Sequence, residues 1–138
     1  MVASTVAARR GVRTNGQESP LSVWIIDDST LFSGAFSRYI ERITGYLNTR
    51  CFDSAESALA ALRAGANGPD VVLLDVRMPG INGLDAIVLL KRAAPESKIY
   101  MVTFADSDWQ RQTALDRGAD GYFDKSDVSK EELMRIFE

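Results

Sequence analysis

The chain contains no histidine among its 138 residues. This absence excludes Ser-His-Asp and Cys-His nucleophile systems, and it removes a common ligand of zinc and iron sites. A chain without histidine also cannot act as a phosphohistidine donor. The groups that remain for chemistry are carboxylates, hydroxyls, lysine, arginine and a metal ion held by carboxylates.

Cysteine and long apolar runs are scarce as well. Cys51 is the only cysteine and cannot form an internal disulfide, which is consistent with a reducing compartment. The apolar run at residues 71–74 is typical of the chain and is far too short to cross a bilayer. Residues 1–20 lack the apolar core of a secretory signal. We therefore expect a cytoplasmic protein with no membrane partner.

Excess positive charge is also lacking, because 16 Lys and Arg stand against 19 Asp and Glu, for a formal net charge of -3. Binding of nucleic acid through this chain itself is therefore not expected. With 46% hydrophobic residues, 138 residues are enough for one domain with a core.

The sequence divides into a tail and a regular region. Residues 1–20 are small and polar without periodicity, which predicts a flexible N-terminal tail. From residue 21 to 138, short apolar segments alternate five times with segments of helical spacing, which predicts one α/β domain: a (βα)5 fold with a doubly wound parallel five-stranded sheet. The expected strands are 21–26, 48–52, 71–74, 98–102 and 121–123. For three of the expected helices, either of two residues can serve as the N-cap: Asp28 or Ser29, Asp53 or Ser54, and Asp127 or Ser129.

Polar residues stand where the strong strands end. They are Asp27, Asp28, Asp75, Thr103 and Lys125. Because parallel strands share their carboxyl end, these residues should lie along one edge of the sheet. Neighbouring strands are only ~5 Å apart, so three carboxylates crowd together if the first and third strands are adjacent.

A crowded acidic pocket requires compensation, because adjacent carboxylates cannot all remain ionised alone. Mg²⁺ is the expected cofactor, since it prefers a few carboxylate oxygens together with water. The plainer alternative is that each aspartate only caps a helix, which suits Asp28 but does not explain Asp75. Lys125 and Thr103 suit a tetrahedral dianion, and a carboxylate beside them can act as a phosphoryl acceptor.

The receiver domain of bacterial response regulators is the family that this sequence resembles, over about residues 21–138. The resemblance rests on Asp27-Asp28, residues 74–80 with Gly83, Thr103 and Lys125. It implies a flavodoxin-like fold and phosphorylation of Asp75 by a sensor histidine kinase. Such a domain is a signalling switch rather than an enzyme, although it catalyses its own phosphorylation and dephosphorylation.

The resemblance also implies individual roles. Asp28 would bind Mg²⁺ directly, Asp27 directly or through water, and Arg77 through its backbone carbonyl, and Asp75 also belongs to the metal site. Thr103 and Lys125 would hold the phosphoryl group.

A switch residue is implied at Tyr122, three positions before Lys125. Thr103 would move toward the phosphoryl group while the ring of Tyr122 turns inward, which alters a protein-interaction face. The alternative reading is an ordinary strand aromatic that packs on a helix. Phe104 stands where the family usually has a small residue, so we expect its ring to narrow the access of small donors to Asp75.

Residues 75–79, Lys125-Ser126 and residues 129–133 resemble receivers of the LuxR-type (NarL-like) transcription regulators most. DNA would then be bound only through an output domain that these 138 residues do not include. The final amphipathic segment shows no Gly or Pro stop signal, which favours a truncated fifth helix over a stand-alone receiver. A homodimer is possible, and a receiver-like module that works without phosphorylation is the remaining alternative.

Two other classes fit less well. A Mg²⁺-dependent phosphatase of the Asp-x-Asp kind requires a second aspartate at position 77, where Arg77 stands. A flavin-binding protein of the same fold class requires a phosphate-binding loop after Ile26, where Asp27 and Asp28 would repel a phosphate.

Overall fold

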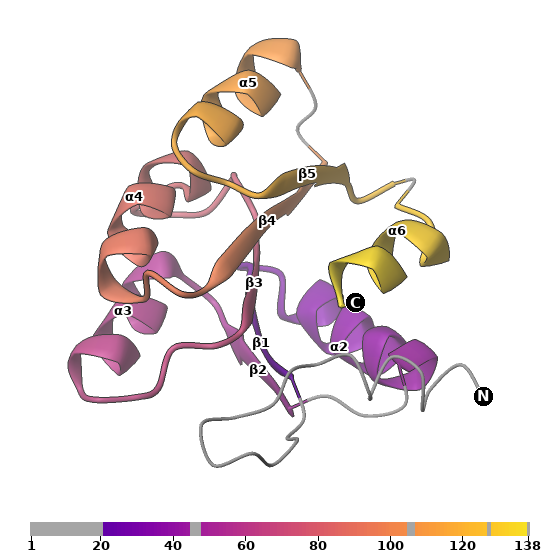
Figure 1. Ribbon diagram of the computed structural model, residues 1–138, viewed down its shortest axis with the longest axis horizontal. Helices are drawn as coiled ribbons and strands as arrows, with labels where there is room; N and C mark the ends of the chain where they lie inside the picture. Colours follow the sequence, from indigo (N-terminus) through magenta and orange to yellow (C-terminus); the bar gives the residue numbers. More distant parts are fainter. Residues whose placement is uncertain (1–20, 45–47, 105–106, 127, 138) are drawn as a thin grey trace.

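A five-stranded parallel sheet forms the centre of the protein in the computed structural model (Figure 1). Its strands are β1 (Ser22–Ile26), β2 (Asn48–Phe52), β3 (Val71–Leu74), β4 (Lys98–Thr103) and β5 (Gly121–Asp124). They lie in the order β2-β1-β3-β4-β5, and each adjacent pair is parallel. The structure describes residues 21–44, 48–104, 107–126 and 128–137, so the predicted tail lies outside it.

Helices connect the strands and cover both faces of the sheet. They are α2 (Thr30–Thr44), α3 (Ala55–Arg63), α4 (Gly83–Ala93), α5 (Asp108–Asp116) and α6 (Lys130–Ile136). α2 and α6 lie on one face, and α3, α4 and α5 lie on the other (Figure 1). The predicted (βα)5 doubly wound fold is confirmed. Within the ranges that the structure describes, none of the helices is long and apolar enough to cross a membrane.

Side chains alternate between the two faces along the strands, as expected for a sheet that is covered on both sides. In β1, Trp24 and Ile26 join the core under α3, α4 and α5, whereas Val23 and Ile25 join the core under α2 and α6. All residues of β3 are buried. This central pair of strands therefore forms a buried base for the polar residues that follow it.

Serine begins the helices at the caps that the sequence left open. Ser54 is the N-cap of α3, and Ser129 forms a reciprocal capping box with Glu132 at α6. At α2, the backbone N–H of Phe32 donates to Ser29 Oγ at 3.2 Å. The aspartate before α2 is thereby left available for the site at the edge of the sheet.

Candidate functional site

Three aspartates gather where β1 and β3 end. The last residues of these strands, Ile26 and Leu74, are paired in register, so Asp27 and Asp75 follow at the same level of the sheet. One carboxylate oxygen from each of Asp27, Asp28 and Asp75 lies within 4.8 Å of the others. Asp27 and Asp75 are buried, whereas Asp28 is exposed. An oxygen cluster that is open on one side fits a hard divalent cation that retains some of its water.

Lys125 brings a positive charge into this cluster. Its Nζ lies 2.6 Å from Asp27 Oδ2 and 3.4 Å from Asp75 Oδ2, and the lysine side chain is only 4% exposed. The backbone N–H of Lys125 donates to the carbonyl of Thr103 at 2.9 Å, which ties the residue after β5 to the end of β4. The sequence predicted Lys125 beside Asp75, but the closer contact with Asp27 was not foreseen.

The pKa of the Asp27 carboxyl group is raised by its surroundings. Burial is the largest influence and raises its pKa above the ordinary value of 3.8. Hydrogen bonds from Lys125 and from the Ser29 backbone N–H, at 2.9 Å, act in the opposite direction, and the charge of Asp75 raises the pKa further. The upward direction means that Lys125 and the Ser29 N–H do not fully offset the burial of this carboxylate, and a cation bound beside it would favour the charged form.

The loop after Asp75 is held close to it by a glycine. A Cβ at Gly83 would overlap the carbonyl oxygen of Asp75, and the Gly83 N–H donates to the Val76 carbonyl at 2.8 Å. From α3, the Glu56 carboxylate accepts the backbone N–H of Ile81 at 3.1 Å. The two ends of the loop are therefore joined to each other, and its second half is also bonded to α3.

Thr103 and Arg77 occupy the remaining predicted positions around the cluster. Thr103 is the last residue of β4 and is 1% exposed. The side chain of Arg77 is exposed, and Arg77 and Asp28 together line a groove of about 610 Å³ that Trp109 borders. Both residues thus lie at the edge of the sheet where the sequence expected them, and their roles stay predictions.

Tyr122, the predicted switch residue, faces the core. It is 5% exposed, and its Oη accepts a hydrogen bond from Gln110 Nε2 of α5 at 2.7 Å. The guanidinium carbon of Arg111 lies 4.9 Å from the centre of its ring. The ring is therefore connected directly to α5.

Two aromatic rings beside Lys125 were not predicted as part of the site. The centroids of Phe32 and Phe104 lie 4.1 Å and 5.2 Å from Lys125 Nζ. The helical spacing of Phe32 from other apolar residues indicates only that it lies on the buried face of a helix. Phe104 was expected only to narrow the access of small donors to Asp75. No sequence pattern connects these residues with Lys125, because they come from different elements and meet only in the folded sheet.

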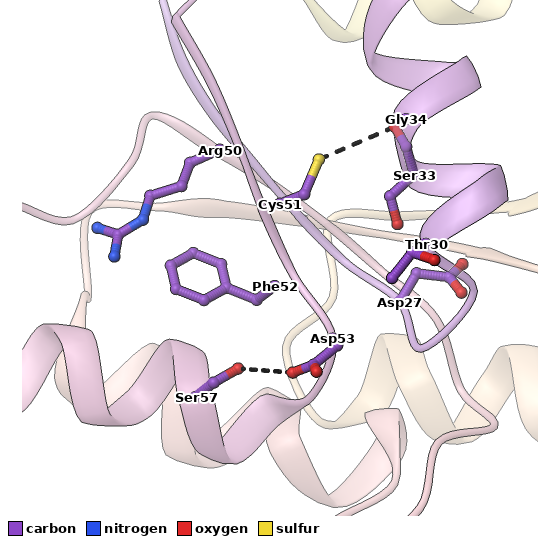
Figure 2. A pocket seen from close by; sticks show the side chains of 9 residues that line it. All are labelled: Asp27, Thr30, Ser33, Gly34, Arg50, Cys51, Phe52, Asp53 and Ser57. Carbon is purple, nitrogen blue, oxygen red and sulfur yellow. Dashed lines mark hydrogen bonds between the residues drawn. The ribbon is translucent and has the colours of Figure 1, made fainter.

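A second groove, of about 580 Å³, opens beside Asp27 at the β2 edge of the sheet (Figure 2). The thiol of Cys51 lies in it, 3.8 Å from the backbone carbonyl oxygen of Ser33. Burial raises the pKa of this thiol, which disfavours a reactive thiolate. The Ser57 hydroxyl donates to Asp53 at 3.4 Å. Several polar groups of this groove are thus bonded to one another.

Comparison with known proteins extends over most of the chain. The family described as response regulator receiver domain matches residues 23–138. Response regulator GacA of Pseudomonas viridiflava is 37% identical over 105 residues, which are 76% of this chain and 48% of GacA. Response regulator UvrY of Escherichia coli is 32% identical over 116 residues, which are 84% of this chain and 52% of UvrY. The chain therefore spans about half the length of the curated relatives it matches.

Solved structures share the fold. The receiver domain of the putative response regulator NarL from Mycobacterium tuberculosis superposes with a TM-score of 0.71 at 27% identity, covering 86% of this chain and 93% of that one. A response regulator from Burkholderia pseudomallei, solved with a phosphorylated aspartic acid, a calcium ion and citrate, gives 0.74 at 26% identity, covering 86% of this chain and 66% of that one.

A parallel sheet with an acidic cluster and a buried lysine at its carboxyl edge defines a receiver-type α/β domain. The chain belongs to the response regulator receiver domain family, and it is the receiver domain of a two-component response regulator. Its relatives include the NarL-like regulators that the motifs predicted. Receiver domains are signalling switches that bind a divalent metal ion at their acidic pocket and interact with histidine kinases.

Proposed function

We propose that Asp75 is the phosphoryl acceptor of this receiver domain and that Lys125 and Thr103 hold the transferred group. The observation that carries this proposal is the buried contact of the Lys125 ammonium with Asp75, inside a cluster of three carboxylates. The carboxylate of Asp75 is held by the Val76 backbone N–H at 2.8 Å through Oδ1, while Oδ2 faces the ammonium.

The reaction is a displacement at phosphorus. A carboxylate oxygen of Asp75 attacks the phosphorus of a phosphohistidine on the kinase, and a new P–O bond forms as the P–N bond breaks. The electron pair of the broken bond remains on the imidazole nitrogen, which takes up a proton. The donor histidine lies outside these 138 residues, which contain none. The signal is ended by hydrolysis, in which water attacks the phosphorus and inorganic phosphate is released from Asp75.

The cation in this pocket is proposed to be Mg²⁺. Asp28 and Asp75 would hold it directly, Asp27 directly or through water, and Arg77 through its backbone carbonyl. The ion supplies positive charge that offsets the repulsion between carboxylates and phosphoryl oxygens. Lys125 supplies a second positive charge beside the Asp75 carboxylate, and Thr103 would offer a hydroxyl donor.

Mass spectrometry of the intact protein tests the acceptor. After incubation with Mg²⁺ and acetyl phosphate, the wild type should gain the mass of one phosphoryl group, and Asp75→Asn should gain none. Asp53→Asn is the matched control, because Asp53 is an aspartate beside a strand end outside the cluster, and it should be phosphorylated normally. An unmodified wild type, or an adduct on Asp75→Asn, contradicts the proposal and favours a module that works without phosphorylation.

The metal is tested by the same reaction in the presence of EDTA, with Mg²⁺, Mn²⁺ or Ca²⁺ added back separately. Phosphorylation should stop in EDTA and return with Mg²⁺. Asp28→Asn should require a higher Mg²⁺ concentration for the half-maximal rate, because one direct ligand loses its charge. An unchanged Mg²⁺ requirement in Asp28→Asn would remove Asp28 from the ligand set.

The output is proposed to be transcriptional. The regulator TcrX of Mycobacterium tuberculosis, described as a probable transcriptional regulatory protein, is 32% identical over 124 residues, which are 90% of this chain and 50% of TcrX. By this likeness, a cytoplasmic sensor kinase domain would phosphorylate the receiver, residues 21–138, which would control a DNA-binding output domain. The reading frame beyond residue 138 tests this: a helix-turn-helix sequence supports the proposal, and a stop codon favours a stand-alone receiver.

Tyr122 is proposed to carry the signal from Asp75 to α5. The hydrogen bond between Tyr122 and Gln110 supports this, because Gln110 belongs to α5. The exposed side chain of Trp109, the preceding residue of the same helix, provides a fluorescent probe of α5. Beryllofluoride should change the Trp109 fluorescence of the wild type, and Tyr122→Ala should reduce this change while phosphorylation of Asp75 persists. Sedimentation with and without beryllofluoride tests whether the switch drives homodimer formation. An unaltered fluorescence response in Tyr122→Ala contradicts the switch.

A further inference from the structure

The ammonium of Lys125 is enclosed by two kinds of partner. Carboxylate oxygens of Asp27 and Asp75 approach it at 2.6 Å and 3.4 Å. The aromatic rings of Phe32 and Phe104 approach it as well, with centroids at 4.1 Å and 5.2 Å. Both ring distances are within the range of about 6 Å in which a cation is attracted to an aromatic face.

The rings and the carboxylates act on the ammonium differently. An aromatic face attracts a cation through its quadrupole but adds no formal charge, so it does not compete with a phosphoryl group for the lysine. It also keeps water away, and the Lys125 side chain is only 4% exposed. Exclusion of water strengthens the attraction between the ammonium and an anion on Asp75. A long, flexible lysine stem is thereby held near its point of action.

Phe32 is held in place by more contacts than Phe104. It stacks on Phe36 with centroids 5.0 Å apart, and its backbone N–H donates to Ser29 Oγ at 3.2 Å in the first turn of α2. Phe104, in contrast, is 67% exposed and lies farther from the ammonium. The contribution of Phe32 should therefore exceed that of Phe104.

We propose that Phe32 and Phe104 are positioning residues for Lys125, which hold its ammonium beside Asp75 for phosphoryl transfer. This inference rests on the proposed function of Asp75 and Lys125. It gives the bulky aromatic ring at position 104 a role in the site, because the ring stabilises the cation beside it.

Substitutions that separate the aromatic face from apolar bulk test the proposal. Leucine keeps apolar bulk without an aromatic face, whereas tyrosine keeps the face. With acetyl phosphate and Mg²⁺, Phe32→Leu should slow the phosphorylation of Asp75 by about fivefold and Phe104→Leu by about twofold, and each tyrosine variant should react at the wild-type rate. Leu31→Ala is the control, because Leu31 is an exposed apolar neighbour of Phe32 on α2, and it should leave the rate unchanged.

A second measurement does not depend on phosphorylation. Urea denaturation of Phe32→Leu, Lys125→Met and the double variant gives the coupling between ring and ammonium. Phe32→Leu should lower the folding equilibrium constant about fivefold more in the wild type than in the Lys125→Met background. Equal effects in both backgrounds overturn the proposal even if Asp75 is phosphorylated. If the ring and the ammonium are coupled but Asp75 is not phosphorylated, only the proposed function is contradicted. In the kinetic experiment, equal phosphorylation rates for Phe32→Leu and Phe32→Tyr would overturn the positioning role.

Discussion

The Lys125 ammonium lies 2.6 Å from the Asp27 carboxylate, and both side chains are almost fully buried. Removing one partner of a buried ion pair leaves the other charge unpaired, which typically costs about 3–5 kcal/mol. We therefore expect Lys125→Met to lose about 3 kcal/mol of unfolding free energy in EDTA, measured by urea denaturation. Saturating Mg²⁺ should restore part of this loss, because a bound cation again offsets the carboxylates.

The control for this prediction is Lys98→Met, which removes an exposed lysine at the start of β4. It should change the unfolding free energy by less than about 0.5 kcal/mol with or without Mg²⁺. Equal losses for Lys125→Met in EDTA and in Mg²⁺ would mean that the lysine and the metal do not neutralise the same carboxylates.

Gly83 should not tolerate a side chain. A Cβ at this position would overlap the carbonyl oxygen of Asp75, which belongs to the backbone and cannot move without displacing the loop. We expect Gly83→Ala to cost about 2 kcal/mol of stability, as overpacking does, and to slow phosphorylation of Asp75. Gly34→Ala in α2 is the matched control, because its Cβ would meet only the end of the Arg38 side chain, at 3.6 Å. It should stabilise the domain by about 0.5 kcal/mol, and a similar loss in both variants would contradict the steric argument.

The bulk of Phe104 should restrict small donors. Alanine and leucine at this position both lack the aromatic face and differ mainly in bulk, so their comparison isolates access to Asp75. We expect Phe104→Ala to react faster than Phe104→Leu with acetyl phosphate by about threefold, measured as the rate of phosphoprotein formation. Equal rates for the two variants would show that the side chain at 104 does not limit entry.

The carboxylate of Asp124 holds the turn after β5, directly before Lys125. The backbone N–H and then the hydroxyl of Ser126 donate to its Oδ1, at 2.9 Å and 2.7 Å, and lower its pKa below the ordinary value of 3.8. A lowered pKa means that the charged form stabilises the fold above pH 3.8 and that this contribution is lost as the pH falls through the lowered value. An NMR titration should find a low pKa in the wild type and in Ser126→Thr, and a higher one in Ser126→Ala. An unchanged pKa in Ser126→Ala would exclude the hydroxyl as a cause.

The gathering of the aspartates at the carboxyl edge of the sheet could be predicted, because it depends only on the direction of the strands. Once β1 and β3 are parallel neighbours, Asp27 and Asp75 must emerge side by side, and this is what the register shows. The helix caps could be narrowed only to pairs of residues, since aspartate and serine accept the same hydrogen bonds. Ser54, for example, was separated from Asp53 only by the observed hydrogen bond with Ser57.

Side-chain contacts between distant elements could not be predicted. The pairing of Lys125 with Asp27 depends on which rotamer a long side chain adopts between two carboxylates. The contact of Phe32 with Lys125 depends on how the first turn of α2 is placed relative to the residue that follows β5. The support of Ile81 by Glu56 joins a loop and a helix that no periodicity relates. Such contacts are decided by packing in three dimensions rather than by spacing along the chain.

The separation of Asp75 and Lys125 by 50 residues has a consequence for the order in which the domain is made. The strands that carry the aspartates precede β5 in the chain, so any docking of β1 against β3 ahead of β5 would bring the carboxylates together without the ammonium that offsets them. In such an intermediate, a cation from the surrounding solution would be the available counter-charge. Early docking of β1 against β3 should thus depend on divalent ions more strongly in the growing chain than in the finished domain.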